Sequence, residues 1–188
     1  MGASMKHDLV IKDGKLVTAN ETFIADIGIK GGKIATLGEN LDGYDLINAA
    51  KKLVMPGGIE AHCHIAQESG MGVMTSDDYE TGSISAAFGG NSSFIPFAAQ
   101  KKGESISDTI DGYDRRAETK SVIDYSYHLI LTDPNHDVLS ELPSAFERGI
   151  TSLKVFMTYA TRVTDAQFLD ILTVARRHGG LTMVHAEN

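Results

Sequence analysis

Two patterns of apolar and polar residues divide the chain near Pro56. Before that residue, short apolar stretches alternate with glycines and charged residues, which is typical of small antiparallel sheets. After it, nearly continuous apolar stretches such as 93–98 and 128–131 alternate with longer segments of helical character. Strands that are apolar on both faces are typical of parallel sheets covered by helices. The pattern predicts an all-β segment over residues 6–56 and an α/β domain over residues 57–188.

The all-β segment holds two candidate hairpin turns. Asp13-Gly14 and Gly31-Gly32 each lie between two apolar runs, and both pairs suit the left-handed backbone of a tight turn. A last short strand is expected near residues 46–48 or 53–55. Because so small a sheet cannot bury both of its faces, we expect it to pack on a surface that the rest of the protein supplies.

The α/β domain is predicted to repeat strand and helix four times before a last strand. The expected strands cover residues 58–64, 92–98, 125–131, 151–157 and 181–186. The expected helices lie between them, over residues 76–88, 105–119, 137–148 and 164–178. Such repeats form a parallel sheet, which is either doubly wound or closed as a barrel.

The positions of the polar residues distinguish these two arrangements. Histidines and a lysine lie in or at the ends of several strands. The active sites of (β/α)₈ barrels are built in this way, from residues of several strands that meet at one rim. A doubly wound sheet favours a glycine-rich phosphate-binding turn after its first strand, and the sequence has no such motif. Because a complete barrel takes about 250 residues, we expect a TIM-like (β/α) barrel that is incomplete in this chain, with about five strands. The chain is therefore expected to be the N-terminal portion of a longer enzyme, or one piece of a cleaved one.

The first candidate site is the run PGGIEAHCH at residues 56–64, which contains the first strand of this domain. Side chains alternate along a strand, so His62 and His64 share one face while Cys63 points to the other. Two imidazoles at this spacing can bind one metal ion, and neutral imidazole suits zinc and similar divalent ions. The alternative is a pair of partly exposed histidines at a strand end.

Lys154 and His185 lie on later strands and join this candidate site. Lys154 shares a strand face with Ser152 and Phe156, within an apolar run. Burial lowers the pKa of a lysine and makes its amine nucleophilic, so that carbon dioxide can convert it to a carbamate able to bridge two metal ions. A two-metal centre acidifies a bound water and polarises a carbonyl group. Taken alone, His185 is more often a core histidine than a ligand.

Composition limits the choice of partner. The 188 residues have a formal net charge of −8, which argues against a nucleic-acid partner. No apolar run approaches the roughly 20 residues that span a bilayer, so no membrane partner is expected. The single cysteine excludes an internal disulfide framework and fits a cytoplasmic protein. Residues 1–5 look like a cloning remnant ahead of a second start at Met5, and His7 is expected to belong to a disordered start. These features favour a small-molecule substrate.

Four motifs, taken together and in order, resemble the dihydropyrimidinase and D-hydantoinase branch of the amidohydrolase superfamily. They are PGGIEAHCH at 56–64, AFGGNSS at 87–93, SLKVFMTY at 152–159 and HAEN at 185–188. The resemblance covers nearly the whole chain. It implies a metal-dependent hydrolase that opens a dihydropyrimidine or hydantoin ring to an N-carbamoyl amino acid. It also implies that the all-β segment is the N-terminal part of a small β-sandwich, and that the full-length protein is a homo-oligomer, a dimer or a tetramer.

The resemblance further implies how two divalent metal ions, expected to be zinc, would be bound. His62 and His64 would hold the more buried ion, and His185 would hold the second. Lys154, carboxylated, would bridge both ions. The family's further histidine and aspartate ligands have no candidate position in this chain.

The substrate would lie beside these ligands. The resemblance implies that Tyr159 donates a hydrogen bond to the scissile carbonyl oxygen and stabilises the oxyanion. Packing at the barrel rim is the alternative role for this tyrosine. Phe156 and the loop 67–74 are expected to shape the substrate pocket.

The residues after the histidine pair bear on the choice of substrate. Relatives that act on dihydroorotate or allantoin resemble one another in an arginine shortly after that pair, and residues 65–70 here contain none. Its absence favours an uncharged cyclic amide. Two other interpretations stay open. One is a catalytically silent assembly module of the same fold, and the other is a different amidohydrolase, such as a dihydroorotase or an allantoinase.

Overall fold

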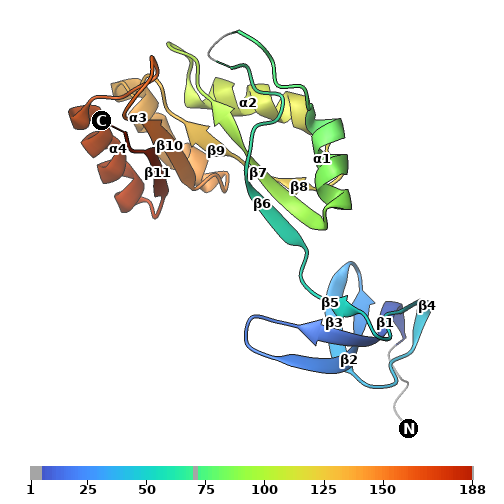
Figure 1. The fold of residues 1–188 in the computed structure, drawn as a ribbon. Helices are drawn as coiled ribbons and strands as arrows, with labels where there is room; N and C mark the ends of the chain where they lie inside the picture. The colour runs from blue at the N-terminus through green and yellow to red at the C-terminus, as the bar shows by residue number, and fades with distance from the viewer. Residues whose placement is uncertain (1–5, 70–71, 188) are drawn as a thin grey trace. The chain divides into compact units, whose positions relative to one another are not determined.

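The chain forms two units, Met1–Pro56 and Gly57–Asn188, each with a sheet of its own (Figure 1). The computed structural model describes residues 6–69 and 72–187. The expected cloning remnant at residues 1–5, two residues of the expected pocket loop and Asn188 lie outside the described residues. None of the helices formed by the described residues is long and apolar enough to cross a membrane.

The first unit is a mixed sheet of five strands. Its strands are β1 (His7–Val17), β2 (Thr22–Lys30), β3 (Lys33–Gly38), β4 (Gly43–Asn48) and β5 (Leu53–Val54). The order is β3-β2-β1-β4, with β5 also paired to β1. The β1–β2 and β2–β3 pairs are antiparallel, whereas β4 and β5 run parallel to β1. The prediction of an all-β segment is therefore correct, and both proposed positions of the last strand are occupied.

One of the two predicted hairpins forms, and the prediction of the other is wrong. Gly31 and Gly32 take positive φ angles of 57° and 73° and join β2 to β3. Asp13-Gly14 does not turn the chain, because β1 continues through it beside β2 with an irregularity in register between Ile11 and Gly14. Asp13 has a φ of 59°, the left-handed residue of a β-bulge rather than of a hairpin.

A buried carboxylate from β2 explains the bulge. Asp26 is 3% exposed and accepts hydrogen bonds from the backbone amides of Asp13, at 2.9 Å, and Leu41, at 3.0 Å. Lys12 forms an ion pair with it at 2.9 Å. Burial alone would raise the pKa of Asp26, but these hydrogen bonds and the lysine outweigh it, and the pKa lies below its usual value. The carboxylate thus fixes the backbone where a turn would otherwise form.

His7 is ordered, contrary to expectation. It is the first residue of β1 and is 3% exposed. Its Nδ1 lies 3.0 Å from the carbonyl oxygen of Asp42, and its Nε2 lies 3.0 Å from Oγ1 of Thr36. Two partners distant in sequence hold this histidine, and neither can be recognised from the residues around it.

The second unit alternates strands and helices as predicted. Its strands are β6 (Gly58–Cys63), β7 (Asn91–Ala99), β8 (Asp124–Tyr125), β9 (His128–Ile130), β10 (Ser152–Phe156) and β11 (Leu181–His185). Its helices are α1 (Tyr79–Phe88), α2 (Ile106–Ala117), α3 (His136–Glu147) and α4 (Asp165–Arg177). The strand expected at 125–131 is split into β8 and β9, both of which pair with β7.

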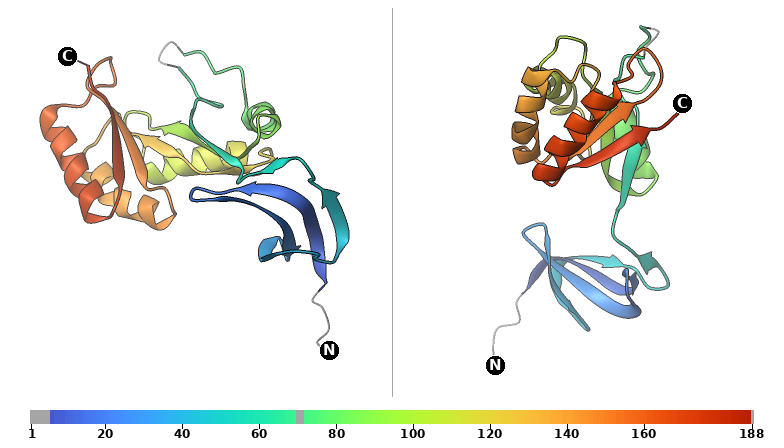
Figure 2. Two further views of the ribbon diagram at one scale, coloured as in Figure 1. Left: turned by 60° about the horizontal axis from the view of Figure 1, so that its bottom comes forward. Right: turned by 90° about the vertical axis from the view of Figure 1, so that its left-hand side faces the viewer.

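The order of the strands follows the order of the chain. The sheet runs β11-β10-β9-β7-β6, and every pair in it is parallel. Successive helices contact one another, α1 with α2, α2 with α3 and α3 with α4, so they cover a common face. Figures 1 and 2 show this layer of helices beside a curled sheet. A doubly wound sheet reverses its strand order and places helices on both faces, so the fold is a curved, half-barrel α/β sheet.

The face of this sheet that meets the helices forms the main apolar core. Its centre consists of strand residues with no exposed surface, namely Phe94, Leu129, Leu153 and Val155. They belong to one cluster with buried residues of all four helices, to which α1 contributes Tyr79. Cys63 packs against the same core. As predicted, strand alternation sends Cys63 to the helices and leaves its two histidine neighbours on the opposite face.

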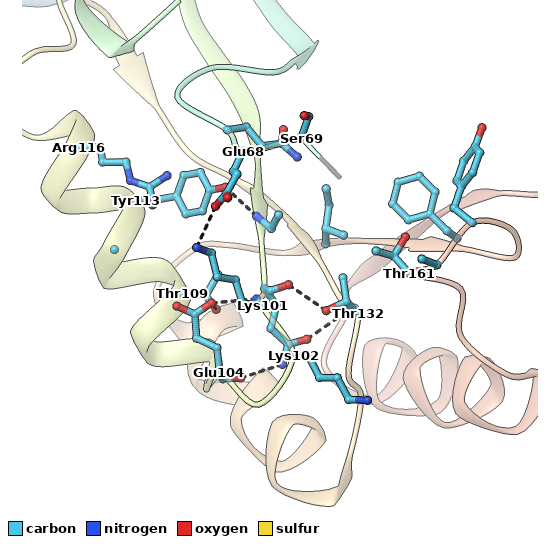
Figure 3. Close-up of a pocket in the computed structure, with 18 residues that line it drawn as sticks. Glu68, Ser69, Lys101, Lys102, Glu104, Thr109, Tyr113, Arg116, Thr132 and Thr161 are labelled. Atoms are coloured by element: carbon cyan, nitrogen blue, oxygen red, sulfur yellow. Dashed lines mark hydrogen bonds and ion pairs between the residues drawn. The ribbon is translucent and has the colours of Figure 1, made fainter. Parts of the chain in front are cut away.

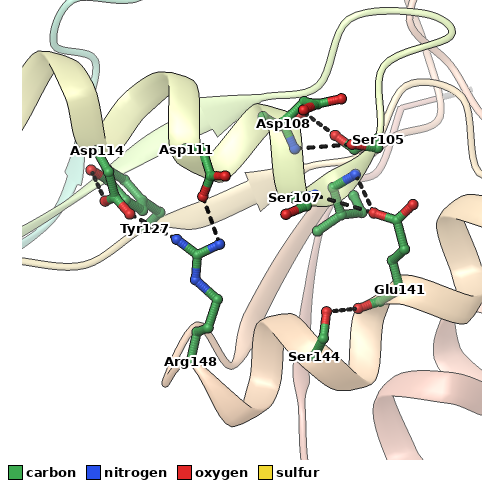
Figure 4. Close-up of polar contacts among 11 residues, drawn as sticks. Ser105, Ser107, Asp108, Asp111, Asp114, Tyr127, Glu141, Ser144 and Arg148 are labelled. Carbon is green, nitrogen blue, oxygen red and sulfur yellow. Dashed lines mark hydrogen bonds and ion pairs between the residues drawn. The ribbon is translucent and has the colours of Figure 1, made fainter.

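Polar contacts between helices complete this layer (Figure 4). The Glu141 carboxylate of α3 accepts hydrogen bonds from the first backbone amides of α2, those of Ile106 at 2.8 Å and Ser107 at 3.1 Å. Arg148, at the end of α3, forms ion pairs with Asp111 and Asp114 of α2 at 2.9 and 2.8 Å. These contacts fix neighbouring helices against each other and so support the sheet that they cover.

Candidate active site

The predicted ligands come together at the inner face of the half-barrel. His62, His64, Lys154 and His185 line one small pocket of about 150 Å³, whose other walls are Phe97, Ile130 and Phe156. His62 is near the end of β6, His64 follows it, Lys154 lies on β10 and His185 ends β11. In a parallel sheet these carboxyl ends meet at one edge, which is where barrel enzymes place their reactive groups.

An aromatic ring packs against the first two histidines. The Phe97 ring centroid lies 4.9 Å from that of His62 and 4.9 Å from that of His64. The two imidazole centroids are 5.7 Å apart, with their planes inclined at 71°. The phenyl ring therefore limits the orientations that either imidazole can adopt.

Two of the histidines have a fixed tautomer. The Nδ1 atom of His64 lies 2.7 Å from the amide oxygen of Gln67, and the Nε2 atom of His185 lies 3.0 Å from a carboxylate oxygen of Glu187. Because these oxygens can only accept, each of those ring nitrogens carries a proton, and in the neutral ring the other nitrogen keeps its lone pair. Histidines that bind metals usually donate their second ring nitrogen in this way.

The donor set of the pocket fits a metal centre only if the lysine takes part. Among residues 6–69 and 72–187, no three histidine, cysteine, aspartate or glutamate side chains are grouped closely enough to hold a metal ion. Lys154 is the remaining candidate ligand of the pocket, and an ammonium cannot bind a cation. A carbamate on its Nζ would supply the anionic oxygens that the imidazoles lack.

The surroundings of Lys154 suit such a modification. Its Nζ lies 5.1 Å from the centroid of the Phe156 ring, and the described residues give it no hydrogen bond or ion pair. Burial lowers the pKa of this amine below its usual value, which raises its neutral fraction. By contrast, burial raises the pKa of the Cys63 thiol to about 11, so that it stays protonated on the helix side.

Tyr159 is exposed beside this pocket. It follows β10, is 60% exposed, and its ring centroid lies 5.3 Å from that of His185 and 6.0 Å from that of Phe156. Its φ of 68° is in the left-handed region, which is unfavourable for a bulky residue. Such strain occurs most often at functional sites.

A larger pocket of about 720 Å³ adjoins the small one (Figure 3). The two share Ile130 and Phe156, and the larger is also lined by Tyr159 and by residues 67–69 of the predicted pocket loop. Two of the three cationic side chains among its described lining residues are engaged by protein partners, and Lys102 is the third. Lys101 forms an ion pair with Glu68 at 3.0 Å, and Arg116 lies over the Tyr113 ring and donates to the carbonyl oxygen of Ala66 at 2.7 Å.

His128 has two polar partners that the residues around it in the sequence do not indicate. It is 6% exposed, with Nε2 at 3.0 Å from the carbonyl oxygen of Ala61 and Nδ1 at 2.5 Å from Oγ of Ser152. Burial lowers its pKa, which favours the neutral ring. The hydrogen bonds from His64 to Gln67 and from His185 to Glu187 could not be predicted from the sequence either, because no local pattern marks these partners.

Comparison with known proteins gives one consistent result. The D-hydantoinase of Geobacillus stearothermophilus is 44% identical over 184 residues, a match that covers 95% of this chain and 39% of that protein. A D-phenylhydantoinase of Escherichia coli is 33% identical over 184 residues, covering 96% of this chain and 40% of that protein. The chain thus spans about two fifths of the length of the curated relatives that it matches. No protein-family model matches it.

Solved structures agree with these relatives. A crystal structure of a D-hydantoinase superposes with a TM-score of 0.90 at 44% identity, covering 95% of this chain and 40% of that one. The dihydropyrimidinase from Brevibacillus agri gives a TM-score of 0.90 at 41% identity, with the same coverage. An L-hydantoinase from Arthrobacter aurescens, at 24% identity and a TM-score of 0.81, shares the fold.

Proposed function

Because the chain is a homologue of the N-terminal portion of the D-hydantoinase and dihydropyrimidinase family, we propose that it serves the metal-dependent hydrolysis of a cyclic amide. The ring C–N bond of a dihydropyrimidine or a hydantoin would open to give an N-carbamoyl amino acid. The observation that carries this proposal is the convergence of three histidines and one lysine on a single pocket at the sheet's inner face.

His62, His64, Lys154 and His185 are the residues that would hold the metal. The proposal assigns the two neighbouring histidines to one divalent ion and His185 to a second, with Lys154 as a carbamate between them. Bound zinc would supply an acidified water and polarise the amide carbonyl. The hydrogen bonds from His64 to Gln67 and from His185 to Glu187 would fix the tautomer and the ring orientation in which the other nitrogen can bind the metal.

Tyr159 is proposed to stabilise the developing oxyanion. Its exposed ring stands at the boundary between the small pocket and the larger one, since it contacts His185 and lines the larger cavity. A phenol in this place can donate a hydrogen bond to an amide carbonyl oxygen without a change in its own charge. The strained φ of this residue is consistent with a backbone held for that purpose.

The larger pocket offers a charged substrate no free arginine among the lining residues that the structure describes. Lys101 is engaged by Glu68, and Arg116 by Tyr113 and the Ala66 carbonyl. Neither of these two cations is therefore poised to bind a substrate carboxylate, which leaves Lys102 as the third cation of the lining. Phe156, which lines both pockets, would pack against the substrate ring.

The proposal also extends to the fold and the assembly of the full-length protein. The chain-ordered sheet with helices on one face suits part of a closed TIM-like barrel. The first unit suits part of a β-sandwich, since Ile34, Leu37 and Ile47 expose at least half of their surface on one face of its sheet. The family resemblance implies a homo-oligomer, a dimer or a tetramer, and light scattering would measure this oligomeric state.

The test is hydrolysis of hydantoin and dihydrouracil by the zinc-loaded protein, with the N-carbamoyl product quantified. Tyr159→Phe removes only the hydroxyl and is expected to lower kcat by about 10²–10³-fold, with the thermal midpoint unchanged. Turnover of dihydroorotate or allantoin in place of these substrates would favour the other amidohydrolases. A folded protein that binds no metal and gives no product would favour a silent assembly module.

A further inference from the structure

His128 joins two strands that are not neighbours in the sheet. It begins β9, yet its Nε2 reaches the Ala61 carbonyl of β6 at 3.0 Å, past the intervening β7. Its Nδ1 contacts the Ser152 hydroxyl on the adjacent strand β10. Each contact lies next to a predicted ligand, because Ala61 directly precedes His62 and Ser152 lies two residues before Lys154 on the same strand face.

The partners define which ring nitrogen carries the proton. A backbone carbonyl only accepts, so Nε2 must be the donor to Ala61. In the neutral ring Nδ1 is then an acceptor, and the Ser152 hydroxyl can donate to it. Both nitrogens of the imidazole are satisfied, and the ring is 6% exposed.

Strand pairing alone does not fix the β6 backbone at Ala61, the residue whose carbonyl oxygen His128 contacts. Pairing of β6 with β7 changes register between Glu60 and Cys63, the interval that contains Ala61 and His62. Among the described strands, β7 is the only one that pairs with β6. The ladder is therefore irregular at the position where the first ligand must be oriented, and the His128 hydrogen bond supplies a tether there.

A ring contact links the same residue to the histidine pair. The His128 ring centroid lies 5.2 Å from that of Phe97. Phe97 in turn packs against His62 and His64 at 4.9 Å each. A displacement of His128 would thus reach both imidazoles through the phenyl ring as well as through the backbone.

We propose that His128 is a positioning residue of the metal site, which fixes the β6 backbone before His62 relative to the strand that carries Lys154. It touches neither metal nor substrate. The proposal rests on the proposed function in its reference to a metal, whereas the tether itself is a property of the metal-free chain.

Three substitutions separate the two contacts. In His128→Gln, an amide nitrogen can take the place of Nε2 and still donate to Ala61. In His128→Asn the amide is too short to reach Ala61 and can meet only Ser152. Ser152→Ala removes the second contact alone. Leu129→Ala is the matched control, because this neighbour has no exposed surface and faces the helices.

The first measurement is the affinity of each variant for Co²⁺, monitored through the d–d absorption of the bound ion. It is made under conditions in which every variant is folded, as denaturation curves show. We expect His128→Asn to weaken cobalt binding by about 10- to 100-fold, the range for residues that orient metal ligands. His128→Gln should stay within a few-fold of the wild type. Leu129→Ala should lower stability while leaving the affinity unchanged. Equal affinities in wild type and His128→Asn, or an equal loss in Leu129→Ala, would overturn the proposal.

The second measurement needs no metal and so distinguishes failure of this inference from failure of the proposed function. Long-range ¹H–¹⁵N NMR spectra of the metal-free protein should show His128 as the Nε2–H tautomer. In His128→Asn the imidazole signals of His62 should shift or double, and those of His178, on the helix side, should not. An Nδ1–H tautomer, or unchanged His62 signals, would overturn the proposal whether or not the wild type binds cobalt.

Discussion

The two faces of the parallel sheet differ although the same strands form both. On β10, Leu153 and Val155 point to the helices and have no exposed surface, while Ser152, Lys154 and Phe156 alternate with them and stay partly exposed. The outer face is a continuous apolar core, and the inner face carries the histidines and the lysine of the pocket.

The difference shows how one strand can serve stability and chemistry separately. A period of two gives each function its own set of positions, so a residue can change on one face without altering packing on the other. Substitutions at adjacent positions of one strand should therefore have different consequences.

The largest effect on stability is expected on the outer face. Leu153→Ala would leave a cavity in the core and lower the free energy of unfolding by about 2–5 kcal/mol. Urea denaturation followed by circular dichroism measures this change. If Lys154→Ala, one position further on, destabilised the protein as much, the two faces would not be separable.

The complementary effect is expected at Lys154. Replacing it by alanine or arginine removes the amine that would become the carbamate, and we expect metal affinity to fall by at least about a hundredfold, since even residues behind the ligands contribute 10- to 100-fold. Isothermal titration with zinc provides the comparison. Lys102→Ala, a lysine at the wall of the larger pocket, is the control. Unchanged affinity in Lys154→Arg would rule out the carbamate.

A smaller effect is expected where two helices of the outer layer meet. Glu141→Ala removes the acceptor of two α2 backbone amides and should lower the free energy of unfolding by about 1–2 kcal/mol. Glu141→Gln keeps one oxygen and should lose less. Thermal unfolding of the three proteins gives the ranking, and any change in metal affinity would contradict the separation of the faces.

The smallest effect concerns an exposed ion pair at the start of α1. The hydrogen bond from Lys120 and those of the helix amides lower the pKa of Asp78 from 3.8 to about 2. A carboxyl group with a lowered pKa stabilises the fold above its unfolded pKa, and this contribution is lost as the pH falls through its folded pKa. Asp78→Asn keeps the helix cap but not the charge. The stability difference between wild type and Asp78→Asn should shrink between pH 4 and pH 2, and a difference independent of pH would contradict the assignment.

Features set by neighbouring residues could be predicted from the sequence. The Gly31-Gly32 turn follows from glycine's freedom at positive φ, and the shared face of Ser152, Lys154 and Phe156 follows from strand alternation. The same rule separates Cys63 from its histidine neighbours. The helix starts also follow from local residues, as at Thr164, whose side chain caps α4 together with Gln167.

Features set by distant residues could not be predicted. Asp13-Gly14 has the composition of a turn, but the Asp26 carboxylate, 13 residues later, holds it as a bulge. His7 and His128 are each held by partners between 24 and 67 residues away, and no local pattern distinguishes them from surface or packing residues. The roles of His62, His64, Lys154, His185 and Tyr159 remain predictions that the pocket supports.

The most direct test of the account is the zinc content of the purified protein, measured by elemental analysis without added metal. The account predicts bound zinc in the wild type and a fall to background in the double variant His62→Ala/His64→Ala, with the urea midpoints of the two proteins alike once the metal is removed. Equal zinc in the two proteins, or none in either, would contradict the assignment of the inner face as a metal site.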